Sequence, residues 1–380
     1  MTKPVPVFPA AGPLALLLAL AAACGADTPR DTGGVDGLVL DVPGWRLERA
    51  ARVGGQDADE DHMLYGAQFV ADDPEGRFYV LNFGDRRLQV FDSTGAFVRN
   101  VGRRGKGPGE FTSPMSVAAV GADALFVLES VPARLMRFRR STGEFAGDVP
   151  IEVKQMAPMR MVVAPNGRVA VELRSLLNDP TKVVSASSVA WVDTATGAVQ
   201  PVVQLDSMTR LRRNVRRPGG TRSTVMDPPF APRPVWAPDG RDGVLFGDGA
   251  EFAVYRAAPG AQPALAFRGE GQAAAVTPED RRRFLESPRG KLFTDYEFPE
   301  RKPFFGGLGV DPHGVVWVQR PGESSAESWE VRGADGRKRG ELRLPARARV
   351  LGITGTSVYV VQKDDLDVET LYRYRLVRGA

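Results

Sequence analysis

The chain has 380 residues, of which 43% are hydrophobic and 25% charged, the balance of an ordinary soluble globular protein. A net charge of +4 is too small for this length to predict a nucleic-acid-binding protein, and only two histidines, His62 and His313, exclude a histidine-rich metal site. The single cysteine, Cys24, excludes an intrachain disulfide and a cysteine metal cluster.

The N-terminal residues have the pattern of a bacterial export signal. Residues 14–23 (LALLLALAAA) form an apolar run, too short to span a bilayer, which takes about 20 residues. The small residues before Cys24 resemble a bacterial lipobox, in which the cysteine is lipidated, although Ala21 stands where leucine is usual. We therefore expect a lipoprotein signal peptide at 1–23, a lipid anchor at Cys24 and a flexible tether at 24–40, with simple secretion as the alternative.

A repeat follows the tether. Residues 76–97 (GRFYVLNFGDRRLQVFDSTGAF) match residues 123–145 (DALFVLESVPARLMRFRRSTGEF) at an offset of about 47 residues. Each copy contains short β-type runs separated by turn residues, which is typical of a small antiparallel sheet.

Hairpins of the same kind recur to the end of the chain. The first hairpin of each unit has relatives at 162–172, 235–247, 309–320 and 352–362, most with an Asp/Asn-Pro or Pro-Asn/Asp turn that ends in glycine. Second hairpins recur at 189–204, 252–267 and 328–344.

These units predict an all-β fold over residues 41–380: a six-bladed β-propeller of four-stranded antiparallel blades. The sixth unit has only three strands before the chain ends at 371–380. Residues 45–55 (WRLERAARVGG) resemble the outermost strand of the first unit, so we expect this N-terminal strand to complete the last blade and close the ring.

The first two units carry the resemblance to a known family. Residues 101–117 (VGRRGKGPGEFTSPMSV), followed by a hairpin and by Arg134-Leu135 before Phe138, resemble the NHL-repeat propellers, above all bacterial six-bladed β-propeller lipoproteins. The segment 363–376 (KDDLDVETLYRYRL) is similar to that group as well. The resemblance implies a structural role for Arg87 and Arg134, which match the family arginine that ties strand loops together.

The glycine-rich stretch 102–111 (GRRGKGPGEF) raises the question of a phosphate loop. It is not a Walker A motif, because Lys106 is followed by glycine and strands, rather than a helix, are expected on both sides. We expect it to carry the chain from the outer strand of one blade to the inner strand of the next. Its exposed amides, with Arg103, Arg104 and Lys106, keep an anion-binding nest as the alternative.

Two insertions fall on the face that carries the loops between blades. The segment 205–234 is rich in arginine, and 276–305 contains a short helix signalled by Thr277-Pro278-Glu279-Asp280. Because binding sites concentrate on long loops, we expect the first insertion to lie beside the ring axis and to bind an anionic partner. Its candidate residues are Arg210, Arg212, Arg213, Arg216, Arg217 and Arg222. The alternative is a solvated arginine surface.

These patterns favour a non-enzymatic, ligand- or protein-binding propeller tethered to the cell envelope. The partner would be an envelope protein, a peptide or an acidic glycan, with no nucleic acid and no cofactor. A metal-dependent, lactonase-like hydrolase or a lyase on the same fold is the alternative. No catalytic residue and no metal ligand is assigned: the alternating acids at 57–61 lack the glycine and glutamate that a calcium loop requires.

Overall fold

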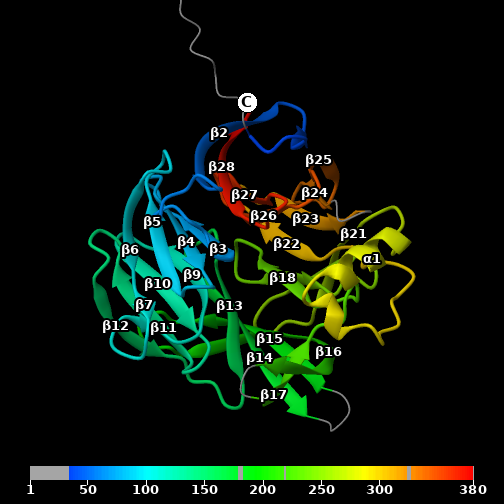
Figure 1. Ribbon diagram of the computed structural model, residues 1–380, viewed down its shortest axis with the longest axis horizontal. Helices are drawn as coiled ribbons and strands as arrows, with labels where there is room; N and C mark the ends of the chain where they lie inside the picture. The colour runs from blue at the N-terminus through cyan, green and yellow to red at the C-terminus, as the bar shows by residue number, and fades with distance from the viewer. Residues whose placement is uncertain (1–33, 179–182, 218–219, 323–326, 380) are drawn as a thin grey trace, which may run out of the picture. The chain divides into compact units, whose positions relative to one another are not determined.

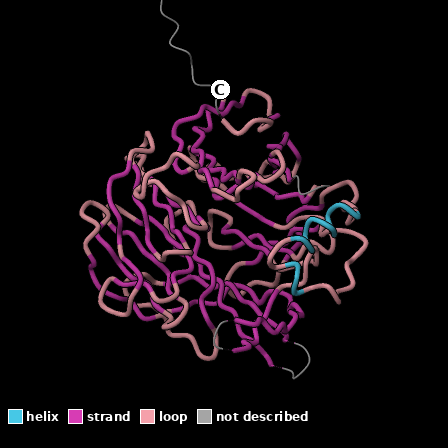
Figure 2. Tube along the Cα trace, viewed as in Figure 1, coloured by secondary structure: helices cyan, strands magenta, loops and turns pink. Residues whose placement is uncertain are grey.

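The computed structural model describes residues 34–178, 183–217, 220–322 and 327–379, which form a ring of β-sheets (Figure 1). Strands dominate its regular structure (Figure 2). Helix α1 (Pro278–Glu286) and the short 3-10 helix η1 (Gly290–Leu292) lie next to each other at one side of the ring. The predicted all-β fold is confirmed, including the helix, whose N-cap is Thr277.

Blades 1 and 2 are the two units recognised in the sequence. Blade 1 consists of β3 (Ala67–Asp72), β4 (Phe78–Asn82), β5 (Arg87–Phe91) and β6 (Phe97–Val101). Blade 2 consists of β9 (Pro114–Val120), β10 (Ala124–Glu129), β11 (Arg134–Arg139) and β12 (Phe145–Pro150). In both blades the first strand is innermost and the fourth forms the outer rim (Figure 1).

Blades 3 and 4 follow the same order. Blade 3 consists of β13 (Ala157–Val163), β14 (Val169–Asn178), β15 (Val183–Val192) and β16 (Val199–Arg217), and β17 (Gly220–Met226) pairs with the distal half of β16. Blade 4 consists of β18 (Val235–Pro238), β19 (Val244–Gly247), β20 (Ala253–Ala257) and β21 (Ala264–Arg268).

Blades 5 and 6 contain the ends of the domain. Blade 5 consists of β22 (Gly307–Val310), β23 (Val316–Pro321), β24 (Glu327–Arg332) and β25 (Lys338–Leu344), with β1 (Val39–Asp41) added at the outer edge of β25. Blade 6 consists of β26 (Ala348–Ile353), β27 (Ser357–Lys363), β28 (Glu369–Arg378) and β2 (Trp45–Gly54).

Strand β2 closes the ring as predicted. It pairs antiparallel with β28 from Trp45 opposite Arg378 to Gly54 opposite Thr370. Strand β1 begins at Val39, so the end of the segment assigned to the tether is also part of the folded domain.

The hydrophobic core is divided among the interfaces between blades. Six clusters of buried side chains each join two neighbouring blades, because a blade has apolar side chains on both faces and only its neighbours can cover them. Trp236 of blade 4 illustrates the fit: its ring is fully buried, and its indole Nε1 donates to Oε2 of Glu172 in blade 3 at 3.2 Å.

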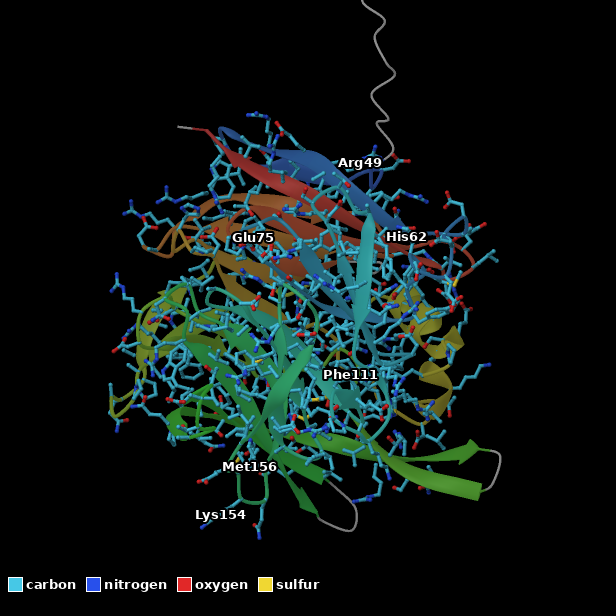
Figure 3. All side chains as sticks on the ribbon, turned by 90° about the vertical axis from the view of Figure 1, so that its left-hand side faces the viewer. Arg49, His62, Glu75, Phe111, Lys154 and Met156 are labelled. Atoms are coloured by element: carbon cyan, nitrogen blue, oxygen red, sulfur yellow. The ribbon has the colours of Figure 1, made fainter. Side chains whose placement is uncertain are left out.

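The two faces of the ring differ. Because successive strands alternate in direction, the connectors between blades and the turns between second and third strands share one face, which we call the connector face. The remaining turns lie on the opposite, turn face. In the side view of Figure 3, His62 lies toward the connector face, as do helix α1 and the hairpin β16–β17, whereas Glu75 lies toward the turn face.

Candidate functional site

The innermost strands of all six blades enclose an axial cavity of about 550 Å³. Its wall is mainly apolar, with side chains such as Phe69, Val117, Met161, Leu308 and Ile353. A second, larger cavity of about 770 Å³ lies beside blade 4 and residues 299–304. The axial cavity is the stronger candidate site, because a few polar side chains converge on an apolar, pre-formed space.

Arg160 of β13 is the cation of the axial cavity that lacks a carboxylate partner. Its guanidinium Nη1 donates to the Trp236 carbonyl oxygen at 3.1 Å, and its Cζ lies 5.1 Å from the centre of the Trp236 ring. Among the described residues, no carboxylate oxygen lies within 4.0 Å of this guanidinium. Burial lowers the pKa of Arg160; Glu172 opposes this and Arg233 adds to it, yet an arginine stays protonated at neutral pH.

Asp72 lines the same cavity at its turn-face end. Thr354 donates from Oγ1 to its carboxylate at 2.8 Å, and the Tyr359 hydroxyl donates to the same oxygen at 3.2 Å. Burial nevertheless raises the pKa of Asp72 above its usual range. This end of the cavity is therefore polar, but its carboxylate already accepts hydrogen bonds from the protein.

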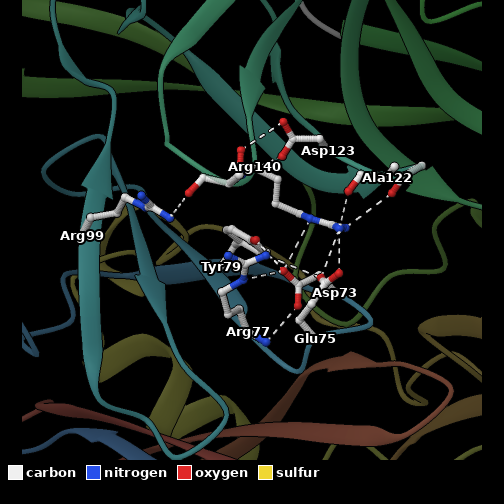
Figure 4. Close-up of polar contacts among 10 residues, drawn as sticks. Asp73, Glu75, Arg77, Tyr79, Arg99, Ala122, Asp123 and Arg140 are labelled. Carbon is white, nitrogen blue, oxygen red and sulfur yellow. Dashed lines mark hydrogen bonds and ion pairs between the residues drawn. The ribbon is translucent and has the colours of Figure 1, made fainter.

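Arg140 also lines the turn-face end, and Figure 4 shows how fully its charge is balanced. Its Nη2 lies 3.1 Å from a Glu75 carboxylate oxygen, and its Nε lies 3.6 Å from the buried Asp73 carboxylate. Asp73 also accepts from Arg77 Nε at 2.9 Å and from the Tyr79 hydroxyl at 2.7 Å. Because this network neutralises itself between blades 1 and 2, Arg160 is the better anchor for a ligand charge.

The glycine-rich loop is a connector, as its sequence favoured. Within it, β7 (Arg103–Arg104) and β8 (Glu110–Phe111) form a short parallel pair. The Glu110 carboxylate accepts from the Lys106 and Gly107 amides at 3.0 and 2.9 Å and from Arg103 Nε at 2.8 Å. These hydrogen bonds lower the pKa of Glu110, and the bond from the Gly107 amide has the largest effect. The Glu110 carboxylate thus occupies the amides that could have bound an anion, while the side chains of Arg104 and Lys106 are exposed.

The basic insertion does not lie beside the axis, and that expectation is wrong. Residues 205–217 form the distal half of β16 and residues 220–226 form the hairpin strand β17, and both continue the outermost strand of blade 3 (Figure 3). Pairing of β16 first with β15 and then with β17 extends the ladder past the blade, so the segment forms a ribbon instead of a loop.

Two of its arginines are already paired. Arg210 Nε lies 2.5 Å from Asp227, and Arg213 Nη2 lies 3.2 Å from Asp295 in the second insertion. Arg212 Nη1 donates to the Ser223 hydroxyl at 3.4 Å. The side chains of Arg216, Arg217 and Arg222 lie outside the described part of the chain, as does Cys24.

Arg87 and Arg134 occupy equivalent positions at the start of third strands. Arg87 Nη2 donates to the Glu60 carbonyl at 3.0 Å, and its Nε lies 2.6 Å from Asp85. Arg134 lies 2.6 Å from Asp148 and 3.3 Å from the buried Glu129. Each guanidinium therefore joins a turn of the connector face to a neighbouring segment.

Among the described residues, no three His, Cys, Asp or Glu side chains are grouped so as to hold a metal ion. Nor does any helix in the described ranges have the length and apolarity needed to cross a membrane.

Sequence reasoning missed Arg160 and Asp72. A signal was present, since Arg160 is the one charged residue in the apolar stretch from Met156 to Val163. Which charged residue of an inner strand faces a shared cavity depends on all six blades, and no single repeat contains that information.

Comparisons with known proteins agree with the observed sheets. A family model described as "6-bladed beta-propeller" matches residues 69–161, from β3 to β13. No curated protein sequence matches the chain. With the matching model and the six sheets together, the chain is a six-bladed β-propeller.

Solved structures resemble the chain over most of its length. A member of the duf4221 family from Bacteroides vulgatus superposes with a TM-score of 0.51 at 10% identity, covering 88% of this chain and 99% of its own. Regucalcin, a calcium-binding protein from Agrobacterium tumefaciens, has a TM-score of 0.46 at 14% identity, with 84% and 94% covered. Virginiamycin B lyase from Staphylococcus aureus has a TM-score of 0.45 at 9% identity, with 88% and 100% covered. At such identities the likeness concerns the fold alone.

Proposed function

We propose that this propeller is a binding protein of the bacterial cell envelope, and that its axial cavity takes an apolar ligand with one anionic group. Arg160 carries the proposal, because it is a guanidinium beside an apolar cavity with no carboxylate within ion-pair distance among the described residues.

The chemistry of the cavity supports this ligand class. A guanidinium binds carboxylate, sulfonate or phosphate through parallel N–H donors, and a hydrogen bond that involves charge contributes about 1.5–3 kcal/mol. The cavity volume of about 550 Å³ falls within the range of about 300–1,000 Å³ typical of small-molecule sites. The apolar wall would supply affinity and Arg160 would select the charge.

A pair of dyes tests the charge requirement. We expect 1-anilinonaphthalene-8-sulfonate to bind the folded domain, and Arg160→Met, which keeps the side-chain volume, to weaken that binding about tenfold or more. N-phenyl-1-naphthylamine has the same ring system without the sulfonate and should bind both proteins equally. Fluorescence titration measures both affinities.

The matched control is Arg241→Ala, which removes an exposed arginine of blade 4. It should leave both affinities unchanged, and thermal melting should confirm that both variants are folded. Equal binding of the sulfonate dye to the native protein and to Arg160→Met would refute the proposal, as would a failure of both dyes to bind.

The envelope location rests on the lipobox-like segment that ends at Cys24. We expect the chain, expressed with its N-terminus in a bacterium, to be acylated at Cys24 and recovered in the membrane fraction. Mass spectrometry of the mature N-terminal peptide detects the acyl mass, and Cys24→Ser should release the protein to the soluble fraction. A mature N-terminus at another residue, without acyl groups, contradicts the anchor.

Two expectations from the sequence stay predictions. One is binding of an acidic peptide or glycan by the arginines of the basic insertion together with Arg103, Arg104 and Lys106. The other is the alternative function, a hydrolase or lyase activity on the same fold.

A further inference from the structure

Three large apolar side chains are exposed on neighbouring segments of the connector face, where blade 6 meets blade 1. Tyr65 is 46% exposed, Phe83 is 42% exposed and Leu366 is 73% exposed. Tyr65 belongs to the connector that enters blade 1, and the other two lie in the turns after β4 and β27. We call these three side chains and the acidic residues around them the acidic-apolar patch.

The patch has a fixed backbone. The Gly84 N–H donates to the Tyr65 carbonyl at 2.8 Å, and the Phe83 N–H donates to the Gly66 carbonyl at 3.1 Å. These bonds continue the β3–β4 ladder beyond its ends. The Gln56 side-chain amide donates to the Asp364 carboxylate at 2.6 Å, which joins the connector to the turn that carries Leu366. The apolar side chains are therefore presented by ordered segments.

The segments that carry these side chains are rich in carboxylates. They are Asp57, Asp59, Glu60 and Asp61 in the connector, Asp85 in the turn of blade 1, and Asp364, Asp365 and Asp367 in the turn of blade 6. The cations of the same segments, which they outnumber, are Arg52, Arg86, Arg87, Arg347 and Lys363.

Several of the carboxylates are neutralised within the patch. Arg52 Nη2 lies 3.0 Å from Asp57, Arg347 Nη2 lies 3.0 Å from Asp367, and Arg87 Nε lies 2.6 Å from Asp85. Within the described part of the chain, no cation lies within 4.0 Å of the carboxylates of Glu60, Asp61 or Asp365. The patch thus keeps unpaired negative charge beside its exposed apolar side chains.

We propose that the acidic-apolar patch docks a segment of another protein whose apolar side chains are flanked by lysine or arginine. Burial of apolar surface contributes about 25 cal/mol per Å², so Tyr65, Phe83 and Leu366 would supply the affinity. The unpaired carboxylates would guide the approach and select a cationic partner. Anionic lipid headgroups would be repelled by the same carboxylates, which is why a protein segment is the assigned occupant.

A labelled amphipathic Leu/Lys peptide is the probe, with a Leu/Glu peptide of the same pattern as its counterpart. Fluorescence anisotropy should show that the native protein binds the Leu/Lys peptide and not the Leu/Glu peptide. The triple variant Tyr65→Ser, Phe83→Ser, Leu366→Ser should bind at least about tenfold more weakly. Glu60→Lys with Asp61→Lys and Asp365→Lys should also weaken binding and reduce its dependence on salt.

Val131→Ser is the matched control. Val131 is 65% exposed in the corresponding turn of blade 2, on the same face but outside the patch, so its replacement should not change binding. Thermal melting of each variant checks that the ring is intact.

Four results would overturn the proposal. They are absence of Leu/Lys binding to the native protein, equal binding of the two peptides, equal losses in the triple variant and in Val131→Ser, and unchanged binding in the triple variant. If the native protein self-associated and the triple variant did not, the occupant of the patch would be a second copy of this chain. If the native protein bound phosphatidylglycerol vesicles and the triple variant did not, the occupant would be a membrane. Either result overturns the assignment of another protein as the partner.

Discussion

Single carboxylate–guanidinium pairs join neighbouring blades at equivalent places around the ring. In one pair, Arg140 of blade 2 lies 3.6 Å from the Asp73 carboxylate of blade 1. In the other, Arg378 of blade 6 donates a hydrogen bond to the Asp311 carboxylate of blade 5. The two residues of each pair are 67 positions apart in the sequence. In each pair the carboxylate lies in the turn after a first strand and the guanidinium at the end of the next blade's third strand. The Asp73 carboxylate is fully buried. The pKa of Tyr79 is raised mainly by burial of its hydroxyl and further by the hydrogen bond to Asp73.

Removing one partner of such a buried pair should be costly. We expect Arg140→Ala to lower the free energy of unfolding by about 1–3 kcal/mol, because the buried Asp73 carboxylate would keep only one of its two cations, Arg77. Urea denaturation followed by tryptophan fluorescence measures the change. Arg139→Ala, at the exposed neighbouring position, is the control and should change stability by less than about 0.5 kcal/mol. Similar effects of the two substitutions would contradict the structural role of the pair.

At the scale of elements, the two insertions pack against each other on one side of the ring. Phe284 of α1 contacts Phe293 with ring centres 5.5 Å apart, and Phe230 of the first insertion lies 6.0 Å from Phe284. Arg213 of β16 lies with its Cζ 5.2 Å from the centre of the Phe293 ring. Part of the arginine-rich ribbon therefore serves to hold the helical insertion, which reduces the positive charge it can offer to a partner.

At the scale of the whole molecule, ring closure depends on a strand from the opposite end of the domain. Strand β2 covers β28, and its Ala51 and Val53 are 4% and 2% exposed within the cluster between blades 6 and 1. Without β2, β28 would become an open edge and one interface between blades would lose part of its core.

Disrupting this closure should affect the entire ring. We expect Ala51→Asp with Val53→Asp to lower Tm by about 10 °C or more, because buried apolar contacts would be replaced by unpaired charges. Differential scanning calorimetry measures Tm, and size-exclusion chromatography should show aggregation. Val39→Asp places the same charge on β1, where the side chain is 42% exposed, and serves as the control. If the double variant melted at the same temperature as the control, β2 would not be the closing strand.

The sequence by itself determined the turns and the helix start, because residues within a few positions of each other specify them. The Asp-Pro-Glu-Gly turn at 73–76 needs a left-handed residue, and Gly76 has φ of 85°; the Thr277 cap and Pro278 begin the helix where they stand. The closing strand could also be predicted, because 45–55 has the pattern of an outer strand and the last unit lacks one.

Tertiary structure alone decided which side chains meet. The ribbon of β16 and β17 follows the outer rim instead of the axis, because pairing with the blade determines its direction. Glu110 occupies the nest of the glycine-rich loop, and Arg160 reaches the axial cavity without a carboxylate partner among the described residues. Such outcomes depend on contacts between residues far apart in the chain. Local turn and pairing preferences, which determine a blade, contain nothing about what the neighbouring blade places against it.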